Sequence, residues 1–119
     1  MTSTTIEQSK HLLELGLDPA TADMVWMCNK WLYSIKDNIL NQEQFSERDT
    51  LAWSLSALLE VMPRPDLYRD VADLWVCATF FKEGSVRGFG KTAIEAACDT
   101  ITKMFKQGLL IKKGGQDGK

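Results

Sequence analysis

Polar and apolar positions near the N-terminus follow the pattern of a capped helix. Thr4 with Glu7, or Thr5 with Gln8, has the spacing of a capping box, in which two side chains satisfy free backbone N–H groups of the first turn. Leucines follow at helical spacing, and Gly16 can adopt the left-handed conformation that closes a helix. The sequence therefore predicts a helix that begins at one of these pairs and ends at Gly16.

Residues 24–33, MVWMCNKWLY, fit two periods. As a strand, alternate residues from Met24 share one face; as a helix, Val25, Cys28 and Leu32 recur at spacings of three and four. We expect a strand, because Val, Trp and Tyr suit a pleated surface, and we keep one long helix as the alternative. The polar segment that follows, up to residue 49, indicates a long loop.

The clearest local pattern begins at Trp53. Ser54 is a good N-cap, Trp53 and Leu58 can form a hydrophobic staple, and a proline soon prevents continuation. These residues predict a helix over 55–62. The charged residues of 64–73 then indicate a solvated turn with salt bridges.

The C-terminal half predicts a hairpin followed by a helix. The apolar run 71–81 favours a strand, 82–84 supplies a reversal, and 85–89 can return antiparallel. Thr92 begins a second capping box, and the helix that it opens has one apolar face and ends at Gly108. We expect this helix to lie across the sheet.

These elements predict a single α+β domain over residues 1–113, with 114–119 as a flexible tail. The fold is one small antiparallel sheet of about three strands, covered on one face by three to four helices. The expected strands are roughly 24–33, 71–81 and 85–89. A chain of 119 residues is long enough for one core.

Charge and composition narrow the environment and the partners. The formal net charge of −2 gives no global positive field, so nucleic acid is disfavoured as a partner. The polar N-terminus does not resemble a secretory signal, and no apolar run approaches the roughly 20 residues that cross a bilayer. We expect a cytoplasmic protein that does not insert into membranes.

The potential metal ligands are scattered. Cys28, Cys77 and Cys98 are odd in number, far apart and set among apolar neighbours, which predicts reduced core thiols in a reducing compartment. His11 is the one histidine, and no pair has a ligand spacing. We expect His11 to face solvent on its helix, and we assign no catalytic residue, metal or cofactor.

The string GSVRGFGKT, residues 84–92, resembles a phosphate-binding loop. Its spacing fails, because the position that requires glycine is Ser85. Too few residues follow Thr92 to build the rest of a nucleotide-binding sheet. We expect a β-hairpin and an ordinary capped helix here, and nucleotide binding ranks as the third explanation of function.

The N-terminal helix, Gly16 and a second short helix capped by Asp18, with Pro19 at its first position, imitate a helix-turn-helix. The second helix offers Asp18, Thr21 and Asp23 to DNA but no Lys or Arg, so phosphates would be repelled. A structural corner between helices is the simpler interpretation. A DNA-binding regulator stays as the alternative function.

Four tryptophans are many for this length. Trp53 has a role in the hydrophobic staple and Trp75 lies within an expected strand, whereas Trp31 and Tyr33 have the least explained surroundings. Tryptophan is enriched where interfaces release water. We therefore predict that Trp31 and Tyr33 form an interaction surface.

Three blocks carry a resemblance: GLDPATADM from residue 16, TLAWSLSALLEVMP from residue 50, and GKTAIEAACDTITKMFKQGLL from residue 90. In order and spacing they resemble a family of small uncharacterised proteins from prophages and mobile elements of anaerobic gut bacteria. The family has no assigned activity, so the resemblance implies a bacterial cytoplasm and an accessory role but no residue roles. We expect a non-enzymatic module that binds a protein partner, with a homodimer left open.

Overall fold

The structure, a computed structural model, describes residues 2–35 and 47–109. Its elements in chain order are α1 (Ile6–Leu15), a 3-10 turn η1 (Pro19–Thr21), β1 (Met24–Met27), β2 (Trp31–Ser34), β3 (Thr50–Ala52), α2 (Leu55–Glu60), β4 (Pro65–Arg69), β5 (Trp75–Phe81), β6 (Gly84–Gly90) and α3 (Ala93–Lys106). The α+β class is confirmed. The single sheet is wrong: the strands form two antiparallel sheets, ordered β2-β1-β3 and β4-β5-β6.

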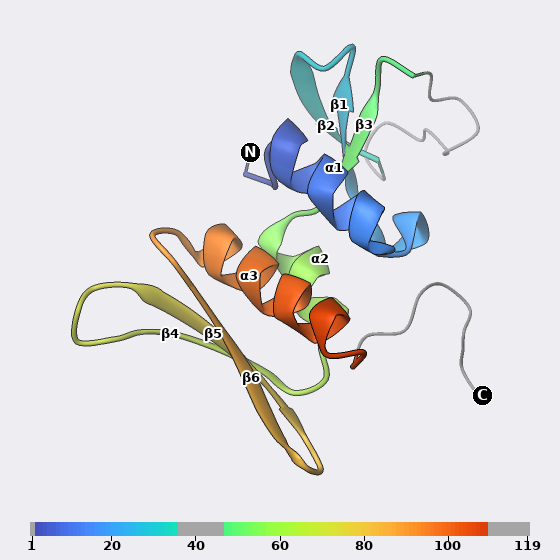
Figure 1. Cartoon of the computed structure of the whole chain (residues 1–119). Coiled ribbons are helices and arrows are strands. Elements are labelled where there is room, and N and C mark those ends of the chain that lie inside the picture. Colours follow the sequence, from blue (N-terminus) through green and yellow to red (C-terminus); the bar gives the residue numbers. More distant parts are fainter. Residues whose placement is uncertain (1, 36–46, 110–119) are drawn as a thin grey trace.

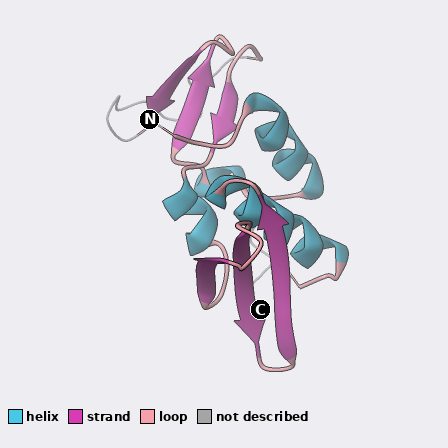
Figure 2. Ribbon diagram, turned by 90° about the vertical axis from the view of Figure 1, so that its left-hand side faces the viewer, coloured by secondary structure: helices cyan, strands magenta, loops and turns pink. Residues whose placement is uncertain are grey.

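The three helices lie between the two sheets (Figures 1 and 2). In Figure 1, α1 lies beside β3 of the N-terminal sheet, while α3 lies across β5 and β6. One hydrophobic core cluster contains residues from α1, α2, β5, β6 and α3. The expected domain boundary at 113 and the tail 114–119 lie outside the described residues.

The predicted strand over 24–33 is a hairpin. Met27 pairs with Trp31, and the three residues between them turn the chain. Cys28 and Asn29 both have left-handed backbones, with φ of 55° and 54°. Asparagine tolerates this conformation better than most residues, so Asn29 is the sequence signal for the turn. The third strand of this sheet, β3, occupies Thr50–Ala52, between the expected loop and the expected helix, where the sequence predicted no element.

The first helix is confirmed, with the second of the two possible capping boxes. Thr5 Oγ1 accepts from the Gln8 N–H at 3.0 Å, and Gln8 Oε1 accepts from the Thr5 N–H at 2.9 Å. Gly16 closes the helix with φ of 111°. The Leu17 N–H then donates to the Leu12 carbonyl at 3.0 Å, and both leucines are buried.

Trp53 joins distant parts of the chain. Its ring is fully buried, and its indole N–H donates to Thr21 Oγ1 at 2.9 Å. Its backbone N–H and carbonyl both bond to Thr4, at 3.1 and 2.9 Å. The next residue, Ser54, caps α2 as predicted. Its backbone N–H donates to the Asp23 carboxylate at 2.8 Å. The helix ends two residues before the predicted position.

The C-terminal hairpin and helix are confirmed, but β4 was missed. Residues 65–69 form an outer strand, and only the following residues form the solvated turn, closed by the Arg69–Asp73 ion pair. Asp70 Oδ1 accepts from two backbone N–H groups in that turn, which explains why β5 begins at Trp75 and not at residue 71.

The close contact between α3 and β6 depends on Gly88, which has no side chain. A Cβ atom on Gly88 would lie 2.3 Å from the Thr100 backbone nitrogen. Thr100 Oγ1 donates across the same contact to the Cys77 carbonyl of β5 at 2.6 Å. Because backbone meets backbone here, α3 lies closer to the sheet than side chains would allow.

Candidate interaction surface

Trp31 and Tyr33 lie on β2, an outer strand of the N-terminal sheet. Their side chains are 56% and 40% exposed. They alternate with half-buried residues along the strand, so they share one face. Across the strand pair they face Met27 and Val25. We call Trp31, Tyr33 and Met27 the β2 surface.

The opposite face of the same sheet is occupied. Trp26 is directed there, and its indole N–H donates to the Thr4 carbonyl at 3.0 Å. The N-terminal segment therefore packs on the Trp26 face and leaves Trp31 on the other. The Lys30 ammonium lies 5.8 Å from the centroid of the Trp31 ring, so the rim of the β2 surface carries a positive charge.

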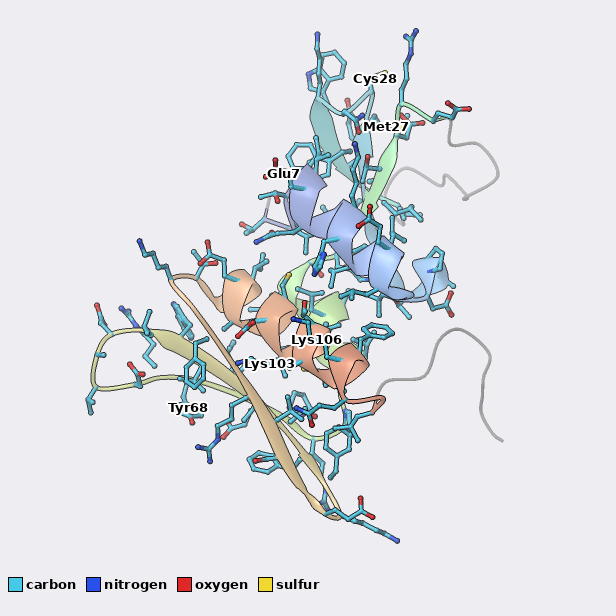
Figure 3. All side chains as sticks on the ribbon, viewed as in Figure 1. Glu7, Met27, Cys28, Tyr68, Lys103 and Lys106 are labelled. Atoms are coloured by element: carbon cyan, nitrogen blue, oxygen red, sulfur yellow. The ribbon has the colours of Figure 1, made fainter. Side chains whose placement is uncertain are left out.

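The three cysteines lie in different environments. Cys77 is buried, Cys98 is partly buried, and Cys28 is exposed in the hairpin turn beside Met27, at the tip that Figure 3 labels. The expectation of a core thiol is therefore wrong for Cys28. Burial raises the pKa of the Cys98 thiol to about 12, and Glu95 and Asp99 add to this effect. Burial also raises the pKa of Cys77, against an opposing hydrogen bond from Thr100.

These environments predict selective alkylation. At pH 8 and under native conditions, iodoacetamide should modify Cys28 alone, because a thiol must be accessible and must lose its proton to react. Cys77 and Cys98 should react only in denaturant or at strongly alkaline pH, since a raised pKa keeps the thiol protonated at pH 8. Peptide mass spectrometry over time measures all three rates. Modification of Cys98 as fast as Cys28 in the native protein would contradict the packing of α3.

The glycine-rich string is a strand and not a phosphate loop. Residues 84–90 form β6, and Thr92 accepts from the Glu95 N–H to cap α3. A Cβ on Gly90, like one on Gly88, would collide with α3, here at 2.5 Å from Glu95 Cβ. Packing therefore accounts for Gly88 and Gly90 of the string that suggested nucleotide binding, and the expected hairpin is confirmed.

The other sequence candidates are dispersed. His11 is exposed on α1. Among residues 2–35 and 47–109, no three His, Cys, Asp or Glu side chains gather in a way that could hold a metal ion. The segment capped by Asp18 is a single 3-10 turn of three residues and not a second helix.

A cavity of about 520 Å³ lies where the N-terminal ends of α1, α2 and α3 meet. Its polar groups are already engaged in the fold: Thr5 and Thr92 are N-caps, and Glu95 Oε1 accepts from the Lys91 N–H at 2.9 Å. The lining residues are Thr2, Ser3, Thr5, Gln8, Leu55, Thr92, Ala93, Ile94 and Glu95. Capping accounts for the main polar side chains here without any ligand.

A second exposed aromatic group was missed from the sequence. Tyr68, Phe80 and Phe89 are 39%, 38% and 46% exposed, and they lie on β4, β5 and β6 respectively. All three occupy the face of the C-terminal sheet that points away from α3. We call this face the outer face.

Comparison of the chain with known protein families, with curated protein sequences and with solved structures finds no match. Within the described part of the chain, no helix has both the length and the apolar character needed to cross a membrane.

Proposed function

We propose that this chain is a non-enzymatic protein-interaction module that acts in the cytoplasm of a bacterium, as an accessory component of a prophage or mobile element. The observation that carries the proposal is the exposure of Trp31 and Tyr33, at 56% and 40%, on one face of an outer strand. The sequence resemblance supports the accessory role. The partner is a protein that covers the β2 surface.

The physical basis is the amount of area that two rigid rings can bury. Tryptophan and tyrosine contribute large contact areas with only two rotatable side-chain bonds each, and both are enriched among residues that dominate binding energies. A tight hairpin holds Trp31 opposite Met27 before any partner arrives. Less conformational entropy is therefore lost on binding than with a flexible loop.

The DNA-binding alternative has less support. The turn Pro19–Thr21 spans three residues, whereas recognition helices that enter a major groove are several turns long. Two of its polar side chains are used within the fold: Asp18 accepts from the Ala20 N–H, and Thr21 accepts from the Trp53 indole. Its charge is also unfavourable for phosphate contacts.

The test compares captured proteins between variants. Tagged wild-type chain and the Trp31→Ser/Tyr33→Ser variant are each used to capture proteins from a lysate of the source bacterium, and the captured proteins are quantified by mass spectrometry. A true partner is recovered with the wild type and lost with the variant. With the partner purified, Trp31→Ser alone should weaken the Kd by about 30-fold, the effect of a 2 kcal/mol binding residue.

Val71→Ser is the matched control, because Val71 is a fully exposed apolar residue in a turn of the other sheet. It removes surface hydrophobicity without touching the β2 surface, so its captured proteins should equal those of the wild type. Capture that is identical for all three baits would overturn the proposal. Unchanged thermal midpoints for the three proteins establish that the differences come from the surface.

A further inference from the structure

The outer face of the C-terminal sheet is ordered in rows across its strands. In one row Tyr68 pairs with Val76, and Val76 pairs with Phe89; in the next, Asp66 pairs with Ala78, and Ala78 with Arg87. Gly88 contacts α3, so its neighbours along β6 must face the other way. In Figures 1 and 2, no other element of the described chain lies on that side of the sheet.

Each row has a small central residue and larger groups at both ends. Val76 and Ala78 on the central strand are only 2% and 1% exposed, so the groups at the two ends of each row provide most of its accessible surface. The charges are separated: an acid, Asp66, lies on the β4 side, and a base, Arg87, lies on the β6 side. The Lys103 ammonium lies 5.1 Å from the Phe89 ring centroid, but Asp99 pairs with it, so Arg87 supplies the positive charge on this side.

We propose that a second copy of this chain covers the outer face, related by a two-fold axis that runs along β5. This axis places β4 of one copy over β6 of the other. Asp66 then meets Arg87 of the second copy, and the reciprocal pair forms by symmetry. Tyr68 meets Phe89 of the second copy in the same way, so the charges and the rings are both self-complementary.

The β6 edge is closed to strand pairing, which favours the face as the contact. The Phe89 N–H donates to Asp99 Oδ2 at 3.0 Å, and Lys103 Nζ donates to the Arg87 carbonyl at 2.9 Å. Asp99 and Lys103 also pair with each other at 3.1 Å. Charged side chains along a strand edge prevent another strand from adding there. Figure 3 labels Lys103 on α3, beside this edge.

The size of the face predicts a weak dimer. Three strands about 4.8 Å apart and up to about seven residues long give a face roughly 15 Å wide and 20 Å long. The area of such a face is smaller than the roughly 800 Å² that each partner contributes to a standard stable interface. We therefore expect a Kd of about 10 to 100 μM, with dimers at high protein concentration and monomers at low concentration.

The test needs only the purified full chain, so its outcome is independent of the proposed function and of any partner. Sedimentation equilibrium from about 5 μM to 1 mM, a range chosen to bracket the expected Kd, should show a monomer–dimer equilibrium for the wild type. Asp66→Arg and Arg87→Asp should each weaken dimerisation by at least about tenfold, because each turns two attractive contacts into repulsive ones.

Two combinations should restore the dimer. The exchange variant Asp66→Arg/Arg87→Asp recreates both opposite-charge contacts with the signs reversed. A mixture of the two single variants should form a heterodimer, because each protein then offers the charge that the other lacks. Only an arrangement that places position 66 against position 87 of the second copy predicts both results.

Matched controls separate these contacts from net charge. Glu83→Arg changes the charge by the same amount as Asp66→Arg but lies in the β5–β6 turn; Lys82→Asp does the same for Arg87→Asp. Both controls should dimerise like the wild type. A wild-type chain that stays monomeric up to 1 mM would overturn the proposal, a limit about tenfold above the weakest Kd expected. Single variants that dimerise like the wild type, or an exchange variant no better than the single variants, would overturn it as well.

Discussion

Replacing Gly88 with valine is expected to destabilise the fold by about 3 kcal/mol, the upper end of the usual effect of overpacking. A Cβ at this position would lie 2.3 Å from the Thr100 backbone nitrogen and 2.6 Å from the Ala96 carbonyl oxygen. Both atoms belong to the α3 backbone, so no side-chain rotation can relieve the clash. The helix must move away from β6, which also separates Thr100 Oγ1 from the Cys77 carbonyl.

Urea unfolding followed by circular dichroism measures this effect. Ser85→Ala is the control, because Ser85 is exposed on the same strand and its loss should change stability by less than about 0.5 kcal/mol. Gly88→Ala should be destabilised in the same direction but less than the valine variant. A valine variant as stable as Ser85→Ala would show that α3 does not approach β6 as closely as described.

Features that depend on neighbouring residues could be predicted from the sequence. A capping box or a left-handed glycine works over three or four positions, so Thr5, Ser54 and Thr92 begin their helices where expected and Gly16 ends the first one. The C-terminal hairpin is equally local, because its turn at 82–84 follows directly on an apolar run. These signals need no knowledge of the rest of the fold.

The division into two sheets depends on contacts distant in sequence. Alternation from Met24 continues on both sides of the turn at Asn29, so hydrophobic periodicity does not reveal where the strand reverses. β3 pairs with β1 across more than twenty residues, and Thr50–Ala52 alone is too short to have a clear strand pattern. β4 was missed because its charged residues suggested a solvated turn. Its short length and its mostly exposed residues gave no apolar pattern that would have indicated a strand.

The candidate surfaces show the same limit. Trp31 and Tyr33 could be identified because a strand places alternate aromatics on one face. The outer face could not, because its rings come from three strands and its register is set by pairing: Tyr68 is eight residues from Val76, and Phe89 is thirteen further along the chain. Only the sheet brings them into one row.

The two proposals are physically connected. A dimer that forms through the outer face leaves the N-terminal sheet of each copy free, so each dimer carries two copies of the β2 surface. A partner with two matching sites would then bind with avidity that exceeds the affinity of one surface. Weak self-association therefore makes binding depend on the local concentration of this chain.

Replacing Trp53 with alanine is expected to lower the free energy of unfolding by about 3 to 5 kcal/mol, the usual loss for a buried tryptophan. The ring is 0% exposed, and its removal leaves a cavity and deprives Thr21 Oγ1 of its indole donor. Trp31→Ala is the matched control, because it deletes the same atoms from a ring that is 56% exposed. Urea denaturation should place the control within about 0.5 kcal/mol of the wild type. Equal losses for the two variants would contradict the assignment of Trp53 to the core and Trp31 to the surface.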